Sequence, residues 1–242
     1  MQTATKNQSF DLTTFAAKPD TESRLLKRGL DLIADRPNAN ILDLGCGVGA
    51  VAIGAAIERQ DVHVTALDIS ASNIAALKDA ARNAGVIDRM TAVCGDYVTE
   101  QPKKYDLIVS DSVLNLLPCS DEVLASRLAG DLTPNGVLVV AMPVSVFSNS
   151  LRVALRKCWR LMPAVADRLV LALAKRVYPH LPTAVLADRI PYLRILPVRL
   201  FGPSMQAAFA RHGLEVVENT LFPSESIAKL THHLIVWRRQ PY

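Results

Sequence analysis

Cysteine is scarce in this chain of 242 residues, and its few copies form neither a disulfide framework nor a metal-binding pattern. Cys46, Cys94, Cys119 and Cys158 include no CxxC pair and do not have the His and Cys spacing of a zinc site. This usage is typical of reduced thiols in a cytosolic protein. We therefore expect no bound metal and a cytoplasmic location.

The chain also lacks a stretch that resembles a targeting signal or a membrane span. Residues 1–15 are polar and contain no apolar signal core. The longest uncharged stretch, Leu132 to Leu151, is long enough to cross a bilayer. It is interrupted by Pro134, Gly136 and Pro143, which favour a turn, a buried strand and a loop. We expect no transmembrane helix.

Half of the residues are hydrophobic, so the chain can bury a large core, and its net charge is only +4. The length fits one α/β unit that carries an insertion. We predict a single domain over residues 1–242, with a loose arm at residues 1–19 and a basic helical insertion at residues 146–200.

Short apolar runs alternate with helical patterns over the first 145 residues, which implies parallel βαβ units. The end of the chain differs, because two strands there are joined by a short link that suits an antiparallel hairpin. Strands are predicted at residues 40–44, 62–67, 90–94, 105–109, 136–142, 213–220 and 230–238, and helices at residues 50–57, 70–82, 121–128 and 203–212.

A glycine cluster, Asp43-Leu-Gly45-Cys46-Gly47-Val-Gly49, joins the first predicted strand to a helix. Glycines let the backbone turn tightly and approach a ligand closely. The cluster also fits the loose dinucleotide pattern G-x-G-x-x-G/A. However, the Asp43 carboxylate disfavours a pyrophosphate and favours a ligand with ammonium and sulfonium groups. We expect Asp43, Gly45, Cys46, Gly47 and Gly49 to bind the cofactor.

Two more aspartates follow the next two strands, at the edge where open α/β sheets bind ligands. Asp68 can accept hydrogen bonds from both hydroxyls of a ribose, with Ile69 beside it. Asp96 can accept one from an adenine amino group, and Tyr97 offers a ring next to the base. Alone, each aspartate suits an ordinary turn or helix cap. Together with the glycine cluster, and in this order, they predict a nucleoside site.

These motifs resemble those of class I S-adenosylmethionine (SAM)-dependent methyltransferases, strongly over residues 25–145 and in pattern only over residues 200–240. The glycine cluster is similar to the first motif of that family, and Asp68 and Asp96 are similar to its ribose-side and adenine-side acids. Residues 105–111 are similar to its fourth motif, at the methyl-transfer end. The resemblance implies a doubly wound, seven-stranded, mostly parallel sheet with an antiparallel last strand, and SAM as the cofactor.

The fourth motif continues into a segment placed to touch the methyl acceptor. We expect Ser110 to contact the cofactor, and Ser112 and Asn115 to contact the acceptor. Asp111 is the expected catalytic acid or base, although a capped turn would explain it equally well. The segment lacks the two prolines found here in enzymes that methylate the amino groups of nucleic-acid bases, which argues against that activity.

Among the histidines, His180 is the one that we assign as a catalytic base, because it lies in the insertion and can cover the site. His232 and His233 are neighbours in the last predicted strand, so at least one of them faces away from the site.

The insertion holds ten of the 27 Lys and Arg residues but only two acids. Helical spacing places Leu151, Leu155 and Met162 on one face and Arg152 and Arg156 on another. Two interpretations follow: a lid over the acceptor, or a basic amphipathic surface over residues 151–178 that touches a membrane peripherally.

We therefore predict a methyltransferase whose acceptor is an oxygen or nitrogen of a small or lipid-linked metabolite. The alternatives are an RNA or protein methyltransferase, a SAM-binding accessory protein without transfer activity, and an NAD-linked oxidoreductase. Few aromatic residues lie among the basic residues, which argues against nucleic acid. The sequence does not define the oligomeric state.

Overall fold

The computed structural model describes residues 19–163, 165–179, 183, 186–187, 190, 194–222 and 230–241, with side chains described from residue 23 onward. The expected arm at residues 1–19 lies almost wholly outside this part, as does His180.

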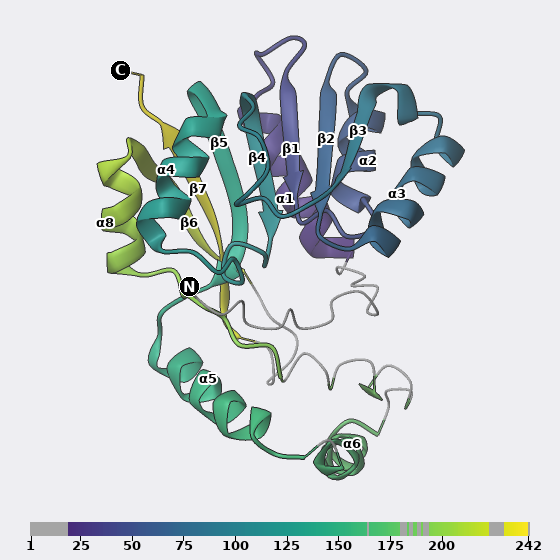
Figure 1. Ribbon diagram of the computed structural model, residues 1–242, viewed down its shortest axis with the longest axis vertical. Coiled ribbons are helices and arrows are strands. Elements are labelled where there is room, and N and C mark those ends of the chain that lie inside the picture. Colours follow the sequence, from purple (N-terminus) through teal and green to yellow (C-terminus); the bar gives the residue numbers. More distant parts are fainter. Residues whose placement is uncertain are drawn as a thin grey trace.

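The strands form one seven-stranded sheet in the order β3-β2-β1-β4-β5-β7-β6 (Figure 1). Only β7 runs antiparallel to its neighbours β5 and β6. The strands are β1 (Asn40–Leu44), β2 (His63–Asp68), β3 (Met90–Cys94), β4 (Tyr105–Asp111), β5 (Leu132–Pro143), β6 (Leu214–Phe222) and β7 (His232–Arg239). This arrangement confirms the predicted fold class.

Helices cover both faces of the sheet. On one face α1 (Pro19–Leu32), α2 (Ala50–Glu58) and α3 (Ala71–Asn83) pack on the strands. On the other, α4 (Asp121–Asp131) packs against α8 (Pro203–Arg211). Each face has its own apolar core, because the parallel strands are buried on both sides. Trp237 of β7 is fully buried in the second core, with its ring centroid 5.1 Å from that of Phe209.

The strand β5 begins at Leu132, four residues earlier than predicted. The turn signal Pro134-Asn135-Gly136 is real, since Asn135 has a left-handed φ of 60°. The pairing of β4 with β5 shifts register between Tyr105 and Leu107, so the turn residues form an irregularity within the strand and do not precede it.

The insertion after β5 contains α5 (Phe147–Arg160) and α6 (Ala166–Val177), as predicted. Both helices lie beyond the carboxyl ends of the parallel strands (Figure 1). Within the described part of the chain, no helix has the length and apolar character needed to cross a bilayer.

Candidate functional site

The glycine cluster forms a tight loop between β1 and α2. Gly45, Gly47 and Gly49 have φ values of 77°, 52° and 90°, a left-handed region that favours glycine. The backbone amides of Gly45 and Cys46 both donate to the carbonyl oxygen of Leu67, at 2.8 and 3.0 Å. The loop is thereby held against the carboxyl end of β2, where Asp68 follows.

Two carboxylates accept hydrogen bonds from backbone amides in the glycine loop and in the first turn of α2. The Oδ2 atom of Asp43 accepts a hydrogen bond of 3.0 Å from the amide of Ala52, in the first turn of the helix. The Oδ2 atom of Asp68 accepts one of 2.9 Å from the amide of Gly47. A helix amino terminus and a glycine loop normally offer such amides to a phosphate. Here both are already paired with carboxylates.

The two carboxylates give the surroundings of the loop a negative charge. The pKa of Cys46, which lies within the loop, reflects this charge. Burial raises the pKa of the Cys46 thiol far above its usual range, and Asp43 and Asp68 raise it further. The thiol stays neutral at physiological pH, so it is not a nucleophile. Burial disfavours charge of either sign, but the contribution of Asp43 and Asp68 is electrostatic, and these two carboxylates favour a cationic ligand.

The side chain of Asp68 is oriented from two sides. Besides Gly47, its carboxylate accepts from the amide of Ser70 at 2.8 Å and from Nδ2 of Asn73 at 3.3 Å. A carboxylate has about four acceptor positions, so one remains for a ligand hydroxyl. The Oδ1 atom of Asn73 is buried and has no partner among the described residues. Ile69 is 47% exposed despite being apolar, which suits a residue that covers a bound base.

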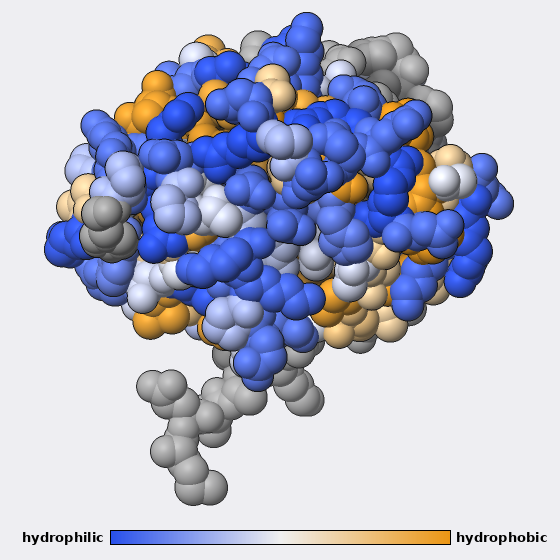
Figure 2. Space-filling model, turned by 90° about the horizontal axis from the view of Figure 1, so that it is seen from above, coloured by the Kyte–Doolittle hydropathy of each residue, from blue (hydrophilic) through white to orange (hydrophobic). Residues whose placement is uncertain are grey.

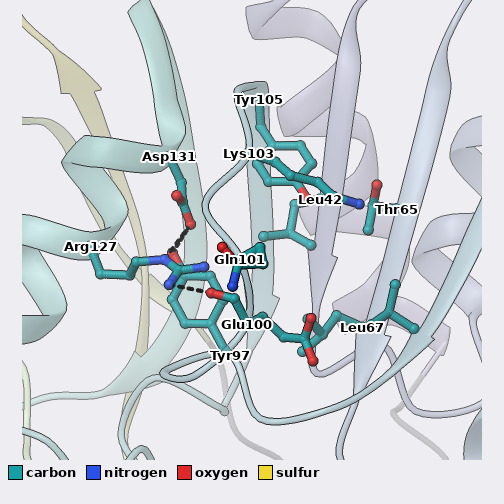
Figure 3. A pocket seen from close by; sticks show the side chains of 11 residues that line it. Leu42, Thr65, Leu67, Tyr97, Glu100, Gln101, Lys103, Tyr105, Arg127 and Asp131 are labelled. Atoms are coloured by element: carbon teal, nitrogen blue, oxygen red, sulfur yellow. Dashed lines mark hydrogen bonds and ion pairs between the residues drawn. The ribbon is translucent and has the colours of Figure 1, made fainter.

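Asp96 lies in the turn after β3, partly exposed, with Oδ1 accepting from the amide of Val98 at 3.0 Å. Tyr97 differs from the prediction. Its ring is only 3% exposed and its hydroxyl donates to Oδ2 of Asp131 at 3.0 Å, beneath the guanidinium of Arg127 (Figure 3). The ring anchors the loop to α4 and leaves no free face for an adenine.

Ser110 also has a structural contact in place of the predicted one. It is fully buried, and its hydroxyl donates to the carbonyl oxygen of Leu44 at 3.0 Å. This bond ties β4 to β1 below the glycine loop. Three residues later, Val113 packs directly on that loop: a Cβ at Gly45 would lie 2.2 Å from Cγ2 of Val113. The predicted cofactor loop and acceptor segment are therefore in contact.

The acceptor segment holds a carboxylate, a hydroxyl and an imidazole in sequence. The hydroxyl of Ser112 lies 2.8 Å from Oδ1 of Asp111 and 3.2 Å from Nε2 of His232. Ser112 has a left-handed φ of 59°, and its amide donates to Ala141 at 2.7 Å. Backbone strain of this kind is found at functional sites, where the surroundings enforce it.

The protonation of His232 follows from its other contact. Nδ1 lies 2.7 Å from the carbonyl oxygen of Leu230, which can only accept, so Nδ1 carries a proton. Nε2 then faces Ser112, whose single hydroxyl proton is donated to Asp111 and can turn to Nε2 once Asp111 takes up a proton. The three groups can pass a proton along this line.

Sequence reasoning missed His232 because it began the last strand at residue 230, which placed both histidines inside the strand and not at its first residue. Since β7 is antiparallel, its first residue lies at the edge where the parallel strands end. His232 is 8% exposed and reaches the site. An antiparallel last strand beginning with histidine is the signal that would have identified it.

Asn115 is held at the same edge by Arg199. The carbonyl oxygen of Asn115 accepts from the amide of Val198 at 2.7 Å. The buried guanidinium of Arg199 pairs with Asp121 at 2.8 Å and donates to the carbonyl oxygens of Leu114 and Cys119. The Oδ1 atom of Asn115 is buried without a partner among the described residues, so it can accept from a ligand.

Comparison with known proteins gives a consistent picture. A family model described as a methyltransferase domain matches residues 35–170, which is more than half of the chain. The chain is 36% identical over 96 residues to a release factor glutamine methyltransferase of Bordetella pertussis, covering 39% of this chain and 34% of that protein. It is 34% identical over 114 residues to a trans-aconitate 2-methyltransferase of Deinococcus radiodurans, covering 47% and 42%.

These matches span less than half the length of the two curated relatives. Among solved structures, the fold is similar to that of the N-methyltransferase NodS from Bradyrhizobium japonicum in complex with S-adenosyl-L-homocysteine. The TM-score is 0.57 at 15% identity, covering 91% of this chain and 86% of that one.

Proposed function

We propose that this chain, which belongs to the methyltransferase-domain family and takes SAM as its cofactor, transfers a methyl group to an oxygen or nitrogen of a small or lipid-linked metabolite. The observation that carries the proposal is the pair of carboxylates at the start of α2. Asp43 and Asp68 occupy the amides that a pyrophosphate would need. They leave a negative surface that suits a sulfonium and an ammonium group.

The residues present fit this cofactor. Gly45, Gly47 and Gly49 carry no side chain, so the backbone of the loop can approach the cofactor closely. The buried Oδ1 of Asn73 lies on the residue that orients Asp68. Asp68 and Asn73 would receive the ribose hydroxyls, and Ile69 and Asp96 the adenine. When bound, the cofactor supplies an electrophilic methyl group on its sulfur.

The chain's own contribution is to position the acceptor and to remove its proton. Asp111 takes the proton of the acceptor hydroxyl or amine. Ser112 accepts it from Asp111 while its own hydroxyl proton moves to Nε2 of His232. At the end Asp111 is again a carboxylate and His232 carries the charge. Asn115 accepts a hydrogen bond from the acceptor through its unpaired oxygen.

The burial of these groups supports a small acceptor or an extended chain end, since Asn115 and His232 are both less than 9% exposed. On the covered side of α5, Arg152 and Arg156 are half-buried, and burial together with Arg152 lowers the pKa of Arg156. Two arginines in such a place suit an acceptor with an anionic group.

A second candidate is methylation of a protein side chain, because one relative is named for glutamine methylation of a release factor. Under this second candidate the methyl group is found on a protein after turnover, whereas under the first it is found on a small or lipid-linked metabolite.

Calorimetry with SAM, S-adenosylhomocysteine and NADH tests the cofactor assignment. Tight binding of the first two and none of NADH is the expected result. Comparable binding of NADH would overturn the assignment and favour an oxidoreductase.

A further inference from the structure

Large exposed hydrophobic side chains are concentrated in one place on this molecule. Among the described residues sixteen are exposed, and ten of these lie between Val146 and Val177. The opposite end of the molecule is covered mainly by hydrophilic residues (Figure 2). The concentration is therefore a property of α5 and α6 and not of the surface as a whole, and apolar patches of this kind mark interaction sites.

The helix α5 has its polar side turned inward. Phe147, Leu151 and Leu155 form a stripe at helical spacing and are 86%, 52% and 61% exposed. The other side is covered: Asn149 is fully buried and donates to the carbonyl oxygens of Val144 and Thr231, at 2.8 Å each. A surface helix normally buries its apolar stripe, so this orientation leaves that stripe for a partner.

The helix α6 continues the same arrangement. Val165, Leu169 and Leu173 are 64%, 73% and 63% exposed, while Ala166 on the other side is buried. Leu161 and Met162, which join the two helices, are 86% and 48% exposed. The apolar surface thus runs from one helix to the next.

Arg194 fixes the junction between the two helices. Its guanidinium forms an ion pair with Asp167 at 2.8 Å and donates to the carbonyl oxygen of Met162 at 3.0 Å. It also lies over the ring of Trp159, with Cζ 5.8 Å from the ring centroid. These contacts fix the two helices relative to each other and leave the exposed apolar side chains uncovered.

The charges beside this surface are of one sign. Lys157, Arg160, Arg168, Lys175 and Arg176 are exposed. Asp167 is the one acid in residues 147–177, and Arg194 pairs with it. An apolar stripe with basic residues along it is complementary to the surface of an anionic bilayer, where the side chains enter the acyl boundary and the cations meet the headgroups.

We propose that the outer face of α5 and α6, comprising Phe147, Leu151, Leu155, Val165, Leu169 and Leu173, docks on the surface of an anionic membrane. The docking does not depend on which acceptor is methylated. It places the carboxyl edge of the sheet, with Asp111 and His232, toward the bilayer.

The test is cosedimentation of the full chain with vesicles and requires no turnover. Vesicles of phosphatidylcholine with about a quarter phosphatidylglycerol should bind the protein, and binding should fall in about 0.5 M salt. The variants Leu155→Glu and Leu169→Glu should each weaken partition onto the vesicles about tenfold, because each removes one apolar side chain that would be buried in the bilayer on docking. Ile57→Glu on α2, where the side chain is also more than half exposed and the same charge is introduced, should bind as wild type does.

The basic residues are tested separately. Lys175→Gln should weaken binding to anionic vesicles about fivefold, and Lys27→Gln on α1 should not. Absence of vesicle binding by the wild-type protein would overturn the proposal. So would sedimentation equilibrium showing a dimer that Leu155→Glu and Leu169→Glu dissociate, since the face would then bind a second copy of the chain.

Discussion

The backbone amide of Gly47 donates a hydrogen bond of 2.9 Å to the carboxylate of Asp68, which ties the middle of the glycine loop to the end of β2. Because the same carboxylate accepts from Ser70 and Asn73, it links the loop to the first turn of α3. The predicted ribose acceptor is therefore also the group that holds the loop in shape.

Replacement of Asp68 by Asn should weaken SAM binding about tenfold or more, since hydrogen bonds to a charged group contribute about 1.5–3 kcal/mol. Asp79→Asn on the exposed face of α3 is the matched control and should bind as wild type does. Isothermal calorimetry on folded proteins measures both. Equal affinities in the two variants would remove Asp68 from the site.

The contact between Gly45 and Val113 predicts a steric effect. A methyl group at Gly45 would overlap Val113, and the left-handed φ adds strain, so Gly45→Ala should lower both stability and SAM affinity. Gly130→Ala, in α4 with open space around it, should be neutral or slightly stabilising. Denaturant unfolding and calorimetry provide the comparison. The double variant Gly45→Ala, Val113→Ala should recover part of the loss, and no recovery would mean that the two residues do not collide.

Tyr97 should affect stability and not cofactor binding. Tyr97→Phe removes a donor from the buried carboxylate of Asp131 and should cost about 1–3 kcal/mol of unfolding free energy. SAM affinity should be unchanged, because the ring is almost completely buried. A loss of affinity with unchanged stability would restore the role that the sequence predicted for this ring.

The line of Asp111, Ser112 and His232 predicts coupled losses of activity. Ser112→Gly removes the hydroxyl but tolerates the left-handed φ, and His232→Gln keeps a polar side chain of similar size. Each should lower kcat about a hundredfold with unchanged SAM affinity. The double variant should be no slower than either single one, whereas multiplicative losses would show that the residues act separately.

The fold was predicted well from the sequence because βαβ units have local signals, namely short apolar runs that alternate with helical patterns. The runs at residues 40–44 and 90–94 became β1 and β3 with those bounds, since each is short, apolar and bordered by turns. The start of β5 was missed because Pro134 and Gly136 signal a turn whether it ends a strand or lies within it.

In the candidate site, the backbone of the glycine loop was predicted better than the contacts of the side chains. Gly45 and Gly49 were expected to allow a tight turn, and they have left-handed φ values, which depend on local backbone conformation. Tyr97 and Ser110 were assigned by position in a motif, but the direction of a side chain after a strand depends on tertiary partners, here Asp131 and Leu44. The role of His232 depends on the residue at which β7 begins and on a contact with Ser112, more than a hundred residues away in the sequence.

The most direct test of the central claim uses methyl-labelled SAM and an extract of the native cells. The wild-type protein should move label into the organic or small-molecule aqueous fraction, and the Asp68→Asn variant should move much less. Label confined to the macromolecular fraction would contradict the proposed acceptor and favour a protein or RNA substrate. No label in any fraction, with SAM binding confirmed by calorimetry, would contradict the transfer reaction itself.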